Sequence, residues 1–149
     1  GQAVHIEEMI EALRSLGHEI RVVAPMSSND QGRMGGGVGW VHRLKSCMPR
    51  ALYELMELAY SLVAYRKLMR AAREFHPDVI YERYNLFLLA GVMARTRLCV
   101  PLLMEVNAPL VHEREMHSGG LSLRRLARWA EGTAWRGADA VLPVTAVLA

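Results

Sequence analysis

The polar side chains best placed for chemistry follow two predicted strands, at the points where each strand ends. They are Arg83, Tyr84, Glu105 and Asn107. The carboxyl ends of neighbouring parallel strands meet at one edge of a sheet, where open α/β folds bind their ligands. Glu105 and Asn107 are two apart along the chain, so their side chains share a face and can address one ligand. We predict that Glu105 and Asn107 are catalytic and that Arg83 and Tyr84 bind substrate. A purely structural ion pair between Glu105 and Arg83 is an equal alternative.

The start of the chain supplies a third group of candidates. Gly1 and Gln2 open a stretch in which apolar residues recur every three or four positions, and Gly17 ends this helix. A phosphate can approach the free N–H groups and the positive dipole at such a helix start, so we count Gly1 and Gln2 as substrate-binding. A helix that leads into a strand is the second part of a β-α-β unit. We therefore expect the first strand of the sheet to lie upstream of Gly1.

Strands and helices alternate along the rest of the chain. The predicted strands are Glu19–Ala24, Trp40–Leu44, Asp78–Glu82, Pro101–Val106 and Ala140–Val144. The predicted helices are Pro49–Phe75, Asn85–Arg95 and Leu121–Arg136, with polar loops at Met26–Gly39 and Asn107–Gly120. This alternation predicts an α/β, Rossmann-like fold, with a mainly parallel sheet and helices on both faces.

The helix Pro49–Phe75 is unusually apolar and comes close to a membrane segment between Arg50 and Arg66. Glu54 and Glu57 lie inside that window, which is shorter than the roughly 20 residues needed to span a bilayer. We therefore interpret it as a helix packed on the sheet. Pro77 disfavours helical geometry at His76 and should end it there.

Composition narrows the class of protein. The chain has 149 residues, 52% of them hydrophobic, which suits one domain with a real core. The net charge of +3 and the pI near 9.1 fall short of a dedicated nucleic-acid binder, so we predict no nucleic-acid partner. Cys47 and Cys99 are too few for a disulfide framework, which indicates a reducing, cytoplasmic location. No signal peptide is visible.

Four segments, in order along the chain, resemble the N-terminal domain of the retaining glycosyltransferases of family four, which have the GT-B fold. The segments are Gly1–Val22, His76–Tyr84, Glu105–Leu110 and Ala138–Thr145. The resemblance implies half of a GT-B enzyme, with residues 1–149 as a partial acceptor-side domain. It also implies a nucleotide-sugar donor, an acceptor glycan, lipid or small molecule, and no metal cofactor. The donor is held mainly by a C-terminal domain, which this sequence does not contain, so we expect the fragment alone to be inactive. Several relatives place a histidine or an aspartate where Asn107 falls.

Two alternatives concern ligands of other kinds. A metal site at His112 and His117 is disfavoured, because the two are five apart, off the i, i+4 spacing of a helical zinc pair. A non-catalytic Rossmann-like module that binds a dinucleotide or a partner protein is the alternative function. The dinucleotide reading requires G-x-G-x-x-G before the first helix and an acidic residue after the second strand. Neither is present.

The helix Leu121–Arg136 carries an arginine-rich face beside an apolar one. The arginines are Arg124, Arg125, Arg128 and Arg136, and only Glu131 opposes them. We interpret this face as solvated, on a helix packed against the sheet. The alternative is peripheral contact with the anionic inner face of a membrane, through the arginines and the pair Trp129 and Trp135.

Overall fold

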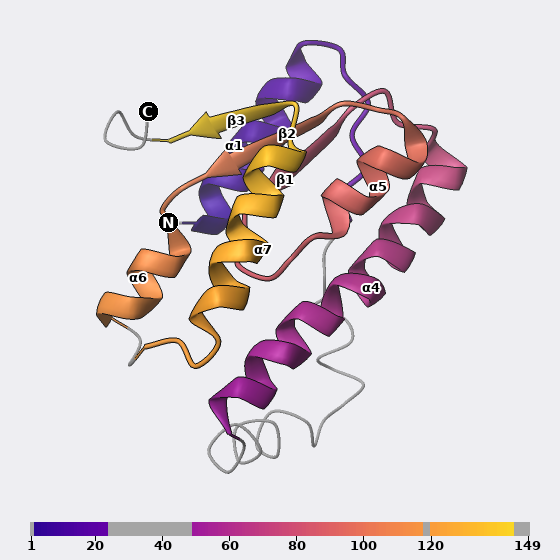
Figure 1. Cartoon of the computed structure of the whole chain (residues 1–149). Helices are drawn as coiled ribbons and strands as arrows, with labels where there is room; N and C mark the ends of the chain where they lie inside the picture. The colour runs from indigo at the N-terminus through magenta and orange to yellow at the C-terminus, as the bar shows by residue number, and fades with distance from the viewer. Residues whose placement is uncertain (1, 24–48, 118–119, 145–149) are drawn as a thin grey trace, which may run out of the picture.

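The computed structural model describes residues 2–23, 49–117 and 120–144 (Figure 1). The elements, labelled as in Figure 1, are α1 (Gln2–Ser15), α4 (Arg50–Phe75), β1 (Ile80–Arg83), α5 (Ala90–Leu98), β2 (Leu102–Val106), α6 (Leu110–His117), α7 (Arg124–Gly137) and β3 (Ala140–Pro143). The described strands form one parallel sheet in the order β1-β2-β3. Figure 1 draws α5 and α7 in front of this sheet and α1 behind it. The predicted fold is confirmed: an α/β, Rossmann-like arrangement with helices on both faces.

The core lies between β2 and the helices in front of it. Leu102, Met104 and Val106 alternate along β2 and are almost completely buried. The side of α7 that packs here is made of small residues, and its buried positions are Ala127, Ala130 and Ala134. Small side chains let a helix approach a sheet closely. A Cβ at Gly137 would lie 2.6 Å from Val92 Cγ1, so the end of α7 requires glycine.

Several element boundaries are confirmed. Helix α4 ends at Phe75, and His76 caps it in the left-handed conformation directly before Pro77. Gly17 follows α1 with φ +88°, as expected of a residue that ends a helix. Among the described residues, no helix is both long enough and apolar enough to cross a membrane.

The strand predicted at Glu19–Ala24 is wrong over its described part, because residues 19–23 lie outside the sheet. Val22 is 58% exposed there. A short β-branched run needs a paired neighbour as well as strand propensity, and residues 19–23 have no strand partner among the described residues. The predicted loop Met26–Gly39 and the predicted strand Trp40–Leu44 fall outside the described residues.

The helix predicted to start at Asn85 begins instead at Ala90. The chain first makes a turn in which Phe87 takes a left-handed φ of +67° while its side chain is buried. Ser61 of α4 holds this turn, since its hydroxyl donates to the Phe87 carbonyl (2.6 Å) and accepts from the Leu89 N–H (3.0 Å). The backbone groups of the turn are thus satisfied by a distant helix.

The loop predicted over Asn107–Gly120 is also wrong, because residues 110–117 form α6. The Pro109 carbonyl accepts the first hydrogen bond of this helix, from the Glu113 N–H at 3.0 Å. Helix α7 begins at Arg124, three residues later than predicted. Glu54 of α4 accepts hydrogen bonds from the N–H groups of Ser122 (2.8 Å) and Leu123 (2.7 Å) directly before α7.

Candidate functional site

A pocket of about 290 Å³ opens at the carboxyl ends of β1 and β2. Its lining residues are Arg83, Tyr84, Asn107, Ala108, Leu110 and Glu113. The first two close β1, the next two follow β2, and the last two lie at the start of α6. The volume is near the lower end of the roughly 300–1,000 Å³ typical of small-molecule sites. The pocket is therefore where an open parallel sheet is expected to bind its ligand.

Glu105 contacts two of the side chains that line this pocket, Arg83 and Asn107, and also contacts Tyr81. It is only 3% exposed, and it pairs in register with Arg83 on the neighbouring strand. Arg83 Nε is 3.7 Å from Glu105 Oε1, and the Tyr81 hydroxyl donates to Glu105 Oε2 at 2.6 Å. Burial, first, and the nearby Glu105 carboxylate, second, raise the pKa of Tyr81 well above its ordinary value. Tyr81 therefore stays protonated and acts as a donor.

Asn107 completes the cluster. With its amide nitrogen facing Glu105, it donates to Glu105 Oε1 at 3.1 Å, and its oxygen accepts from Arg83 Nη2 and Nε at 2.7 and 2.6 Å. An amide nitrogen carries two hydrogens, so one remains for a ligand. Arg83 likewise has five N–H donors, more than these contacts use. The Glu105 carboxylate, as acceptor, thus holds Arg83 and Asn107 in place as hydrogen-bond donors beside the pocket, and we call these three residues the Glu105 cluster.

Tyr84, which lines the pocket, and the start of α6 are both hydrogen-bonded to Glu131 of α7. The Tyr84 hydroxyl donates to Glu131 Oε1 at 3.1 Å, and the Val111 N–H donates to the same oxygen at 3.3 Å. The rings of Tyr84 and Trp135 meet edge to face, with centroids 5.8 Å apart. Burial and then the Glu131 carboxylate raise the pKa of Tyr84 far above its ordinary value. Glu131 thereby fixes both the Tyr84 ring and the start of α6.

Helix α6 is also joined to α4. Arg114 makes two hydrogen bonds to the Glu57 carboxylate, at 2.7 and 3.0 Å, and its guanidinium lies over the Phe87 ring, 5.9 Å from the centroid. The bonds to Glu57 raise the pKa of Arg114 further, against the opposing effect of burial. A bidentate pair of this kind restricts orientation as well as distance. It holds the helix that carries Glu113 in place at the pocket.

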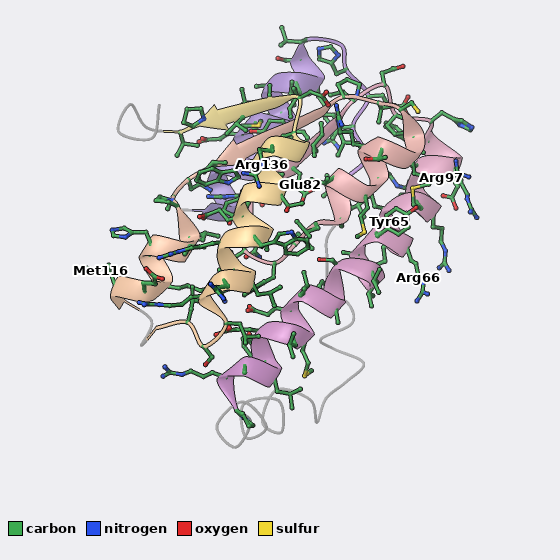
Figure 2. All side chains as sticks on the ribbon, in the orientation of Figure 1. Tyr65, Arg66, Glu82, Arg97, Met116 and Arg136 are labelled. Carbon is green, nitrogen blue, oxygen red and sulfur yellow. The ribbon has the colours of Figure 1, made fainter. Side chains whose placement is uncertain are left out.

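A second glutamate, Glu82, lies next to Arg83 but points to the other face of the sheet. Figure 2 shows it in the layer between the sheet and the helices α5 and α7. A Cβ at position 91 would collide with its carboxylate, so Gly91 leaves the space that Glu82 occupies. Within the described part of the chain, Glu82 Oε1 has no hydrogen-bond partner. Burial raises the pKa of Glu82 to about 7, against a hydrogen bond from the Gly91 backbone.

The structure brings together four of the six residues predicted for the site. Arg83, Tyr84 and Asn107 line the pocket, and Glu105 contacts Arg83 and Asn107. Gly1 is outside the described residues, and the side chain of Gln2, the first residue of α1, is not described. The phosphate-binding role of that turn stays a prediction. For Glu105 and Arg83 the predicted ion pair is present, and of the two only Arg83 lines the pocket.

The sequence reading missed three residues of the site. Glu113 was assigned to a loop, although Pro109 before an apolar pair and an acidic residue in the first turn are signals of a helix start. Tyr81 falls within the predicted strand Asp78–Glu82, and Glu131 is predicted only as a charge on an amphipathic helix. Their contacts with Glu105 and Tyr84 join residues 24 and 47 positions apart. No local pattern signals contacts of that range.

The donor set of the site suits hydroxyl and anionic groups. Arg83 and Asn107 offer N–H donors, and Glu113 offers a carboxylate acceptor. In the part of the chain that the structure describes, no three His, Cys, Asp or Glu side chains are grouped so as to hold a metal ion. The side chain of His117 lies outside that part, so the expectation of a metal-free site stays a prediction.

Comparison with known proteins gives one match. The model of a family described as "Glycosyl transferase 4-like domain" matches residues 1–149. No curated protein and no solved structure matches the chain.

Proposed function

The chain belongs to the glycosyl transferase 4-like family, and from that premise we propose that it forms the acceptor side of a retaining glycosyltransferase. As a glycosyltransferase domain it acts on a sugar donor and an acceptor. We propose that the donor is a nucleotide sugar held mainly by a second domain, and that the acceptor is a glycan, a lipid or a small molecule. The family match favours this function over a non-catalytic Rossmann-like module.

The observation that carries the proposal is the pocket beside the Glu105 cluster. Sugar hydroxyls need donors and acceptors in fixed positions, and the pocket supplies Arg83, Asn107 and Glu113. Asn107 and Arg83 hold each other through bonds of 2.6 to 2.7 Å, so little reorganisation is needed when a ligand arrives. Preorganised donors of this kind stabilise charge that develops in a transition state.

The six predicted residues take different roles in this proposal. Asn107 is the catalytic residue, because its remaining amide N–H is free for the reacting groups, and Arg83 and Tyr84 bind substrate. Glu105 is almost fully buried, so we propose that it acts through Asn107 and Arg83, as a positioning residue. Gly1 and Gln2, at the start of α1, are proposed to approach the donor phosphates.

The test is sugar transfer by the protein expressed from its complete reading frame, assayed with a panel of nucleotide sugars and acceptors. Asn107→Ala should lower kcat on the order of 100-fold, as expected for the loss of one preorganised donor. The control is Glu7→Ala, on the exposed surface of α1, which should leave kcat unchanged.

Two results would contradict the proposal. Equal effects of Asn107→Ala and Glu7→Ala would remove the reason to place the reaction at this pocket. Transfer by residues 1–149 alone would contradict the division of labour between two domains, because a two-domain cleft needs both walls to orient donor and acceptor. Product analysis by NMR would decide retention, and an inverted anomeric configuration would refute it.

A further inference from the structure

The outward face of α4 is apolar along the first half of the helix. The residues that share this face are Leu52, Leu55, Met56, Ala59, Leu62 and Val63. They are spaced three or four apart, which places them on one side of a helix. The five larger side chains are between 45% and 55% exposed. We call this surface the α4 strip.

The acidic residues of the same half of α4 face inward. Glu54 is 4% exposed and accepts hydrogen bonds from the two N–H groups before α7, while Glu57 binds Arg114. A helix on the surface of a soluble protein normally buries its apolar side and exposes its charges. In the first half of α4 two glutamates face inward and the apolar strip faces outward, although Leu58 also packs against the core. Packing against the described part of the protein therefore leaves much of the apolar surface of α4 exposed to solvent.

Beyond Val63 the outward face becomes basic. Arg66, Arg70 and Arg73 are all exposed on it, and among the described residues none of the three has an acidic partner. The acidic residue near them, Glu74, lies 3.7 Å from Arg21. Figure 2 shows Arg66 and the neighbouring Arg97 of α5 projecting away from the body of the protein. One side of one helix thus presents an apolar segment and then a cationic one.

We propose that this face of α4 lies on an anionic membrane surface. The α4 strip would enter the boundary between headgroups and acyl chains, where an apolar helix face is stable. The arginines would lie against lipid phosphates, in the same plane because they share the outward side. An anionic membrane surface therefore matches both halves of this face, the apolar half through its acyl chains and the cationic half through its phosphates.

A second copy of the chain fits this face less well. Standard protein interfaces involve roughly 20–30 residues on each side, whereas the α4 strip is a single narrow row on one helix. The inference is also distinct from the membrane contact predicted through Leu121–Arg136. In that region Arg124 and Arg128 lie 3.1 and 3.7 Å from Glu115, so part of its positive charge already has a partner.

The experiment is flotation of the protein, expressed from its complete reading frame, with phosphatidylcholine vesicles that contain or lack phosphatidylglycerol. We expect binding to the anionic vesicles, weaker at high ionic strength because salt screens the arginines. Binding of equal strength to neutral and anionic vesicles would overturn the proposal, and so would no binding at all.

A matched pair of variants tests the apolar half. Leu55→Gln/Met56→Gln should weaken vesicle binding about tenfold, because two side chains that enter the interface become polar. Leu16→Gln/Met116→Gln makes the same two changes at exposed positions, directly after α1 and in α6, and should have no effect. Both variants change surface residues, so their thermal unfolding should match that of the parent protein. Equal vesicle binding by the two variants would refute the role of the α4 strip.

A second pair tests the basic half. Arg66→Gln/Arg70→Gln should weaken binding about 25-fold, since each arginine near an anionic surface is worth about fivefold. The triple change of Arg124, Arg125 and Arg128 to Gln on α7 should weaken it less. A larger loss in the α7 variant would overturn the assignment to α4. A dimer in solution that Leu55→Gln/Met56→Gln dissociates, without vesicle binding, would identify the face as a contact between copies and also overturn it.

Discussion

Glu82 and Glu105 lie on neighbouring strands, are both largely buried and have opposite surroundings. Glu105 faces the side of the sheet that carries Arg83. Its carboxylate contacts the Arg83 guanidinium, the Tyr81 hydroxyl and the amide of Asn107, which lines the pocket. Glu82 points to the other face, into the layer under α5. Its Oε1 has no hydrogen-bond partner among the described residues. The two differ in their partners far more than in their burial.

This difference shows what burial does to a carboxylate in this fold. Desolvation penalises the charged form, and hydrogen bonds to the charged form offset that penalty. At Glu82 the offset is a single backbone bond from Gly91, and the pKa rises to about 7. At Glu105 the charge is shared with Arg83, Tyr81 and Asn107, which also fixes these groups beside the pocket. The well-satisfied glutamate is thus the one at the candidate site.

The same substitution at both positions should have opposite effects on stability at pH 8. Glu105→Gln should lower the free energy of unfolding by about 2 kcal/mol, because charge-assisted hydrogen bonds are lost while Arg83 stays largely buried. Glu82→Gln should raise it by about 1–2 kcal/mol, because a poorly satisfied charge is removed. Urea unfolding of the two variants measures both values. If both substitutions changed the free energy of unfolding in the same direction, the hydrogen-bond partners would not determine what burying each carboxylate costs.

The pH dependence of stability sharpens the comparison. The ordinary pKa of the Glu82 carboxyl is 4.5, and the folded value of about 7 lies above it. Below pH 4.5 the group is protonated in both states and has no effect. As the pH rises to 7, the unfolded chain loses this proton first, so ionisation favours unfolding. We expect Glu82 to lower the free energy of unfolding by up to about 3 kcal/mol between pH 4.5 and pH 8.

Parallel urea titrations across this pH range separate Glu82 from other groups. The difference between the parent protein and Glu82→Gln should grow with pH and level off above pH 7. Asp139, whose pKa is lowered to about 2 by Arg95 and by the Leu102 N–H, titrates below the range and does not contribute. A difference that is independent of pH would show that Glu82 does not titrate as described.

A smaller effect tests the space around Glu82. Gly91→Ala should destabilise the protein by about 1–3 kcal/mol, because its Cβ collides with the Glu82 carboxylate. In the Glu82→Ala background the same change should be neutral or stabilising, since alanine is favoured over glycine inside a helix. A double-mutant cycle by thermal unfolding measures this coupling. Additive effects would mean that the two residues do not share the space.

The sequence was sufficient for the three strands of the described sheet and for the polar ends of β1 and β2. The runs 79–81 and 101–106 are apolar and bounded by breakers, so their pairing and the meeting of Arg83, Tyr84 and Asn107 followed from the rules of parallel sheets. Helix α4 was also predicted, and Pro77 marked its end. These features depend on residues close together in the chain. The functional roles of the site residues stay predictions.

The starts of α5 and α7 were mispredicted for one physical reason. A helix start is recognised in a sequence by a local capping side chain, and the residues before α5 and α7 provide none. Instead the free N–H groups are satisfied from a distance, by Ser61 at Leu89 and by Glu54 at Ser122 and Leu123. A hydrogen-bond partner up to 69 positions away cannot be recognised from the residues next to the helix start.

These distant partners give α4 a part in the folding of the whole domain. Its inward side supplies the groups that complete the turn before α5 and the start of α7, and its Glu57 anchors α6. If α4 detaches, the backbone amides of Leu89, Ser122 and Leu123 lose their acceptors together. These amides should therefore exchange with deuterium at one common rate, as a single cooperative unit that opens only when α4 leaves. Helix α4 thus precedes the sheet in the chain and completes the starts of two helices that come later in it.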